Sequence, residues 1–158
     1  MTLSQPDGFE NMCFFVYNIL RRRGIFMKLI FCIDDRNGLS FNKRRQSRDR
    51  NVIEDILNIT HSTLLGISSY SEPLFEGKDV KTVSDFNEAL LTCDAYFAEN
   101  EVTEEMLEKA DSLTIYFWNR AYPGDSFVSI DEGIWKMERE REFKGNSHDR
   151  ITVREYRK

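Results

Sequence analysis

The stretch MKLIFCIDDRNG, residues 27–38, decides the fold of this chain. Residues 28–34 form a nearly continuous apolar run of strand length, which is typical of a strand covered on both faces. Asp34 to Gly38 then supplies the residue types of a tight turn, including a glycine that can take a positive φ. The stretch therefore predicts a buried strand that runs into a turn at the start of an α/β domain.

Outward from this strand, helix and strand patterns alternate. Ser47 or Asp49 can cap a helix that extends through Thr60, and the apolar residues of that segment fall on one stripe. Three further helices are predicted. Ser68 or Ser69 can cap the first, Ser84 caps the second, and Thr103 starts the third.

The predicted strands fit the same alternation. They cover 63–66, 94–98 and 113–119, and the segments 135–143 and 149–156 alternate like paired antiparallel strands. The order predicts one α/β domain with a central mixed sheet, about four flanking helices and a C-terminal antiparallel strand pair.

Length and composition exclude several classes of protein. With 158 residues, 41% of them apolar, the chain can bury one core and is too short for two ordinary domains. A net charge of -5 argues against general nucleic-acid binding, which needs a basic face. Three separated cysteines and two histidines predict neither a disulfide framework nor a metal site. These counts exclude zincins, multi-histidine metallohydrolases and disulfide-stapled secreted modules.

The first 26 residues differ from the rest. The apolar run MCFFVYNIL, residues 12–20, precedes three arginines, the reverse of a secretory signal, and is too short to span a bilayer of roughly 30 Å. An Arg-Arg-Gly triplet shortly before Met27 is what a translated purine-rich ribosome-binding site would give. We expect the domain to cover 27–158 and residues 1–26 to be a poorly structured extension from a mis-assigned start. An interfacial membrane anchor is the alternative.

Four stretches carry a family resemblance through their order. MKLIFCIDDRNGLSFN (27–42) is a strand, a turn and a loop that leads into a helix, and TLLGISSYSEPLF (63–75) is a strand, a glycine and a helix. Residues 80–117 follow as a capped helix, a strand, a helix and a strand, and PGDSFVSIDEGIW (123–135) completes the set. Together they resemble dihydrofolate reductase over residues 27–158. The resemblance implies that family's fold.

On the cofactor side the chain departs from this family. The family binds NADPH through a glycine pair that lets the pyrophosphate approach the bare backbone, where this chain has Ala98 and Glu99. Ile67 stands in place of a phosphate-binding arginine, and the segment EGKDVKTV (76–83) shortens the region that contacts the 2′-phosphate. The cofactor-side positions by resemblance are Gly66, Ser68, Ser69, Ala98, Glu99 and Asn100. A carboxylate at Glu99 would also repel a diphosphate. With three phosphate-binding devices missing, we expect no NADPH binding in the family's manner.

The resemblance also implies a substrate pocket with a carboxylate early in the first helix, which holds a pterin and assists protonation. Asp49 and Glu54 are the nearest acids, and Asp49 fits better because it starts the helix; an ordinary helix cap is the alternative. Tyr116 stands in place of a hydroxyl residue that supports the pterin, with a buried core tyrosine as the alternative. The other implied pocket residues are Cys32, Ile33, Val52, Ile53, Ile56 and Gly66.

Five basic residues crowd the loop that would border this pocket: Lys43, Arg44, Arg45, Arg48 and Arg50. Arg44 and Arg45 could clamp a phosphate or carboxylate with bidentate geometry. The alternative is a solvated loop whose charges are balanced by nearby acids.

These features favour a cytoplasmic protein of bacterial type that binds a small nucleotide- or pterin-like anion, as a monomer or homodimer, with no membrane partner. The first alternative is an NADPH-dependent reductase of a pterin or pyrimidine-type substrate, with Asp49 or Glu54 as the acid. A weaker one is an RNA-processing nuclease, because the start MKLIFCIDD is similar to that of small proteins described as ribonuclease Z. That enzyme needs an HxHxDH cluster, which this chain lacks.

Overall fold

The computed structural model describes residues 26–158. The extension expected at residues 1–26 therefore lies outside the described residues, apart from Phe26. Among the described helices, none has the length and apolar character needed to cross a membrane.

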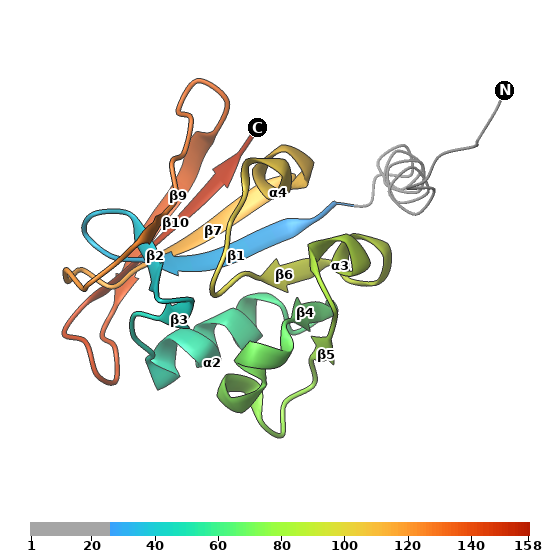
Figure 1. The fold of residues 1–158 in the computed structure, drawn as a ribbon, viewed down its shortest axis with the longest axis horizontal. Helices are drawn as coiled ribbons and strands as arrows, with labels where there is room; N and C mark the ends of the chain where they lie inside the picture. Colours follow the sequence, from blue (N-terminus) through green and yellow to red (C-terminus); the bar gives the residue numbers. More distant parts are fainter. Residues whose placement is uncertain (1–25) are drawn as a thin grey trace, which may run out of the picture.

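A seven-stranded mixed sheet organises the domain, in the order β5-β4-β6-β1-β7-β10-β9 (Figure 1). Its strands are β1 (Lys28–Ile33), β4 (Leu65–Ile67), β5 (Lys81–Thr82), β6 (Ala95–Phe97), β7 (Ser112–Phe117), β9 (Lys136–Phe143) and β10 (Ile151–Arg157). The apolar run that opens the fold, β1, pairs in parallel with β6 and β7, so it lies in the middle of the sheet. The C-terminal strands β9 and β10 form the predicted antiparallel pair.

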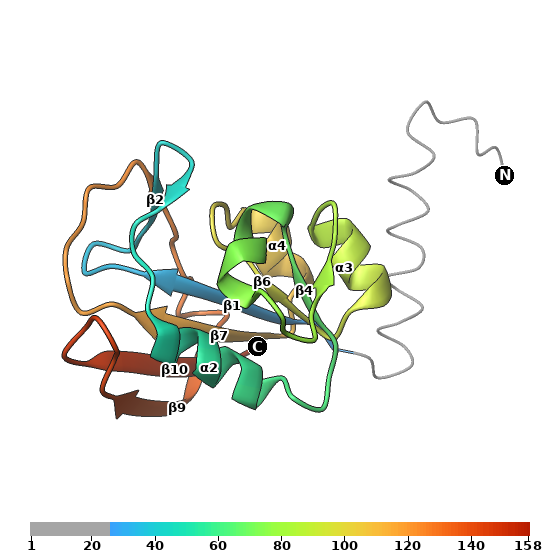
Figure 2. The same ribbon diagram turned by 90° about the horizontal axis from the view of Figure 1, so that it is seen from below.

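Helices cover both faces of this sheet (Figure 2). They are α2 (Arg50–Ile59), the 3-10 helix η1 (Ser69–Phe75), α3 (Phe86–Thr92) and α4 (Glu104–Lys109). Buried residues of α2 and η1 share one apolar cluster with Ile30 and Tyr116, and those of α3 and α4 share a second with Phe31 and Leu113. The predicted fold class, a single α/β domain with this sheet and four helices, is confirmed.

Local signals explain most helix boundaries. The side chain of Asp49 accepts a hydrogen bond from Asn51 N at the start of α2, so Asp49, rather than Ser47, is the cap. The prediction that Ser84 caps α3 is wrong. Asp85 is the cap, because its carboxylate accepts from Glu88 N, while the backbone N–H of Ser84 donates to the Glu88 side chain. Either residue type can cap, so the sequence did not separate the two neighbours.

A small antiparallel sheet stands beside the main one, in the order β3-β2-β8. Its strands are β2 (Gly38–Phe41), β3 (Arg44–Arg45) and β8 (Ser126–Phe127). Asn42 and Lys43, with φ of 50° and 61°, form the two-residue turn between β2 and β3, as a hairpin with a primed turn requires. This hairpin holds Arg44 and Arg45 at one end of the domain.

Candidate functional site

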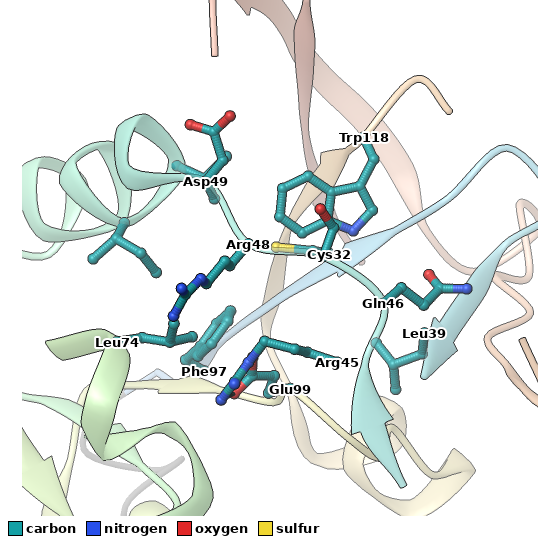
Figure 3. A pocket seen from close by; sticks show the side chains of 13 residues that line it. Cys32, Leu39, Arg45, Gln46, Arg48, Asp49, Leu74, Phe97, Glu99 and Trp118 are labelled. Carbon is teal, nitrogen blue, oxygen red and sulfur yellow. Dashed lines mark hydrogen bonds and ion pairs between the residues drawn. The ribbon is translucent and has the colours of Figure 1, made fainter. Parts of the chain in front are cut away.

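A pocket lies where β1, β6 and β7 end, beside the start of α2 (Figure 3). Its cavity volume is about 20 Å³, room for about one water molecule. The lining residues are Cys32, Leu39, Arg45, Gln46, Ser47, Arg48, Asp49, Val52, Ile53, Leu74, Phe97, Glu99 and Trp118. We call it the switch-point pocket.

The sheet topology explains the position of the pocket. From β1 the chain passes through α2 to β4, toward one edge of the sheet, and from β6 it passes through α4 to β7, in the opposite direction. The strands β6 and β1 are neighbours, so a crevice opens between their carboxyl ends. In open α/β sheets, ligands bind in this place.

One end of the pocket is closed by a partly buried ion pair between Arg45 and Glu99. The guanidinium of Arg45 binds the carboxylate through Nε and Nη2, and Ser71 Oγ donates to the same carboxylate at 2.7 Å. The Arg45 guanidinium also lies 4.4 Å from the ring centre of Tyr70. The bond to Glu99 raises the pKa of Arg45. The Glu99 carboxylate, which was expected to repel a diphosphate, is thus already neutralised. Its bonds tie β3 and the segment after β6 to η1.

The other arginines of the loop lie differently. Arg48 is exposed, lines the pocket, and extends toward Leu74 and Phe97 (Figure 3). Within residues 26–158 it pairs with no carboxylate. Arg44 is also exposed but is not part of the pocket wall. Arg48 is therefore a cation of the pocket wall that has no carboxylate partner among residues 26–158.

The Asp49 carboxylate points out of the pocket (Figure 3) and is saturated with hydrogen bonds. Besides capping α2, it accepts from the backbone N–H groups of Asn146 and Ser147, each at 2.8 Å, and contacts His148 Nδ1 at 2.9 Å. Burial alone would raise its pKa, but these hydrogen bonds lower it to about 2. Asp49 is a buried, ionised anchor for the loop between β9 and β10.

Behind the pocket wall lies a buried histidine that sequence reasoning did not place at the site. His148 stacks on Trp118 with ring centres 4.7 Å apart. Its Nε2 lies 3.2 Å from Ser47 Oγ and 2.8 Å from the hydroxyl of Tyr122. Ser47 and His148 are 101 residues apart, so no local pattern could have joined them.

Of the predicted site residues, the pocket brings together Cys32, Arg45, Asp49, Val52, Ile53 and Glu99. Burial, with the carboxylates of Glu99 and Asp49 nearby, raises the pKa of the Cys32 thiol well above its usual value, so Cys32 is an uncharged wall residue. The predicted residues outside the pocket wall are Ile33, Arg44, Glu54, Ile56, Gly66, Ser68, Ser69, Ala98, Asn100 and Tyr116.

Several of these have other partners. The Tyr116 hydroxyl donates to Asp55 at 2.6 Å, and Arg141 binds the same carboxylate through both terminal nitrogens. Burial first, then the charge of Asp55, raises the pKa of Tyr116. Glu54 is exposed on α2, and Asn100 donates to the carbonyl of Lys43. In the part of the chain that the structure describes, no group of three or more His, Cys, Asp or Glu side chains could hold a metal ion.

The chain was compared with known proteins. No protein-family model matches it, and no curated protein matches its sequence. Among solved structures, it is similar to the dihydrofolate reductase of Enterococcus faecalis complexed with NADP(H) and RAB-propyl, with a TM-score of 0.61 and 12% identity. The match covers 84% of this chain and 95% of that chain. The likeness shows that the chain has a dihydrofolate-reductase-like fold.

Proposed function

We propose that this protein binds a small, partly apolar anion in the switch-point pocket. The observation that carries the proposal is Arg48, a guanidinium without a carboxylate partner among the described residues, at the wall of an otherwise largely apolar crevice. A carboxylate or phosphate beside Arg48 would gain a charge-assisted hydrogen bond. The first turn of α2, with its positive dipole end, begins two residues later.

The walls suggest which kind of ligand fits. Val52, Phe97 and Leu74 offer apolar surface, while Glu99 and Gln46 add polar groups to the wall. Such a set suits a flat ring that carries an anionic group, as nucleotides and folate-like molecules do. The cavity has room for only about one water, so binding must displace the side chains at its mouth.

A nicotinamide cofactor fits poorly at the positions of this chain that correspond to the family's cofactor side. The solved reductase above is complexed with NADP(H). In this chain the positions of the family's glycine pair hold Ala98 and Glu99, and Glu99 is buried in its bonds to Arg45 and Ser71. Ile67 is 1% exposed and offers no charge to a phosphate. We therefore propose a binding protein rather than a standard NADPH-dependent reductase.

The test is a thermal-shift screen of the full chain, followed by calorimetry, with dihydrofolate, methotrexate, NADPH, NADH and a panel of nucleotides. A ligand at 100 times its dissociation constant stabilises the fold by about 2.7 kcal/mol, which raises the melting temperature by several degrees. We expect a nucleotide or folate-like anion to do this.

Arg48→Ala should weaken that ligand at least about tenfold, because a hydrogen bond to a charged group contributes roughly 1.5–3 kcal/mol. Arg44→Ala is the matched control, since Arg44 lies on the same loop but outside the pocket wall. Equal affinity in Arg48→Ala and the parent would contradict the proposal. Stabilisation by NADPH would favour the reductase instead.

A further inference from the structure

We propose that Ser47, His148 and Asp49 form an acyl-transfer triad, which makes the switch-point pocket a site for hydrolysis of small esters. The inference rests on the proposed function for its substrate class only: an ester whose acyl part or alcohol carries an anionic group for Arg48. The triad itself is argued from distances and burial.

The three side chains are arranged as nucleophile, base and orienting acid. Asp49 Oδ2 lies 2.9 Å from His148 Nδ1, and His148 Nε2 lies 3.2 Å from Ser47 Oγ. Triads are recognised by this geometry and not by order in the sequence, and they occur on unrelated folds. Here the residues come from the loop before α2 and the loop before β10.

The base is held in one tautomer and one orientation. Asp49 is ionised, since its hydrogen bonds lower its pKa to about 2, so it accepts the proton on His148 Nδ1. That leaves Nε2 without a proton, and its lone pair faces the hydroxyls of Ser47 and Tyr122. The stack on Trp118 at 4.7 Å fixes the plane of the ring.

The base is buried, whereas the nucleophile is partly exposed. His148 and Asp49 are 5% and 2% exposed, whereas Ser47 is partly exposed and lines the pocket. Arg48 follows Ser47 directly, so a positive charge lies on the same pocket wall as the nucleophile. Positive charge favours the oxyanion that forms during acyl transfer.

Tyr122 is the competing hydroxyl. Its oxygen lies 2.8 Å from His148 Nε2, and it donates to Ser47 Oγ at 3.2 Å. Ser47 is part of the pocket wall and Tyr122 is not. We therefore assign the nucleophile to Ser47.

The reaction follows from these positions. Ser47 Oγ bonds to the carbonyl carbon as its proton passes to His148 Nε2; the ester C–O bond then breaks, and the alcohol leaves with that proton. Water, deprotonated by His148 Nε2, attacks the acyl group on Ser47, and the proton returns to Ser47 Oγ as the carboxylic acid leaves. Ester and water become acid and alcohol, and no further reactant is needed.

The experiment treats the full chain with a fluorophosphonate and, separately, with p-nitrophenyl acetate, and follows the adduct by intact mass and peptide mapping. We expect a single adduct at Ser47, abolished in Ser47→Ala and formed about 100-fold more slowly in His148→Gln. Ser129→Ala is the control, since Ser129 is exposed and outside the pocket wall. It should react like the parent.

Three results would overturn the triad: no adduct with either reagent, an adduct at Tyr122, or unchanged labelling of Ser47→Ala. Circular dichroism of Ser47→Ala and His148→Gln checks that each variant is folded. Labelling of His148→Gln is compared with the parent only if its spectrum matches that of the parent. Calorimetry of the parent, with the nucleotide or folate-like anion that gives the largest thermal shift, separates the two proposals. A parent that binds this anion but is not labelled keeps the binding function and removes the triad, and a parent that is labelled but does not bind it does the reverse.

Discussion

Asp49 shows how much one side chain contributes in this molecule. Its carboxylate satisfies the first turn of α2, two backbone N–H groups of the loop before β10 and a histidine ring nitrogen. If the carboxylate were removed, these donors would lose this acceptor, and the one on the buried ring of His148 would lie away from water. The side chain is therefore an anchor between two segments about a hundred residues apart in the sequence.

This anchor predicts acid sensitivity. The pKa of Asp49 falls from an ordinary value near 3.8 to about 2 in the folded protein, so the stabilisation is present above about pH 4 and is lost as pH falls toward 2. It amounts to about 2 kcal/mol. Hydrogen bonds from the backbone of Tyr122, Gly38 and Arg36 outweigh burial and lower the pKa of Asp34, which acts in the same direction.

Urea titrations of the parent and Asp49→Asn between pH 2 and pH 6 measure this effect. The gap in unfolding free energy between the two should close as the pH approaches 2. Asp35→Asn is the control, since Asp35 is exposed. A gap that is constant over this range would contradict the assignment.

At the residue scale, the sequence predicted what depends on near neighbours. Asp49 could be identified as a helix cap because the cap and its first turn are adjacent in the chain. The partners of Asp49 at 146–148 could not, since no local pattern encodes a contact across that separation. For the same reason Glu99 was expected to repel a diphosphate, whereas Arg45, 54 residues away, neutralises it.

At the scale of elements, the contact between β4 and α3 depends on a missing side chain. A Cβ added at Gly66 would lie 2.9 Å from Cys93 Sγ and 3.5 Å from Ala89 Cβ. Gly66 and Cys93 are both buried, so the strand and the end of the helix pack at the distance that a glycine allows. The family resemblance placed Gly66 on the cofactor side; its packing role needs no cofactor.

Gly66→Ala should destabilise the fold by about 1–3 kcal/mol, because it overpacks this contact. Replacing the sulfur partner should relieve the clash, so Gly66→Ala with Cys93→Ala should cost less than the sum of the single changes. Denaturant midpoints of the two single variants and the double variant give the coupling free energy. Strict additivity would show that Cys93 does not limit the approach of β4.

Among the elements, those with long, uniform patterns were predicted well. The buried run of β1 and the single apolar stripe of α2 each express one period over their whole length. η1 was expected as an ordinary helix, but it is a 3-10 helix with Pro73 inside it. β5 was not predicted, because a strand of two residues has no period to detect.

The whole molecule is two apolar clusters on either side of one sheet. Trp135 belongs to the cluster with α3 and α4, and Trp118 to the cluster with α2. They are the two tryptophans of the chain, and both are buried. Each cluster thus carries its own fluorescent reporter.

We predict that both clusters unfold in one transition, because they share the strands of the sheet. Ile56 is fully buried in the cluster of α2, so Ile56→Ala should cost about 2–5 kcal/mol. In a Trp118→Phe background, Trp135 alone reports, from the opposite face. When Ile56→Ala is added, the urea midpoint recorded by Trp135 fluorescence should fall by the same amount as the midpoint recorded by circular dichroism. An unchanged Trp135 midpoint would show that the two faces unfold separately.

The direction of the strands has a practical consequence. Lys28, near the first described residue, pairs with Ser112, and Ser112 pairs with Arg157, next to the last residue of the chain. Two strand spacings separate Lys28 from Arg157, about 10 Å. A short glycine linker could join these points in a circularly permuted protein. The switch-point pocket lies where β1 ends and not where it begins. Attachment of the protein to a biosensor surface through Lys28 or Arg157 would therefore leave the pocket facing the solution.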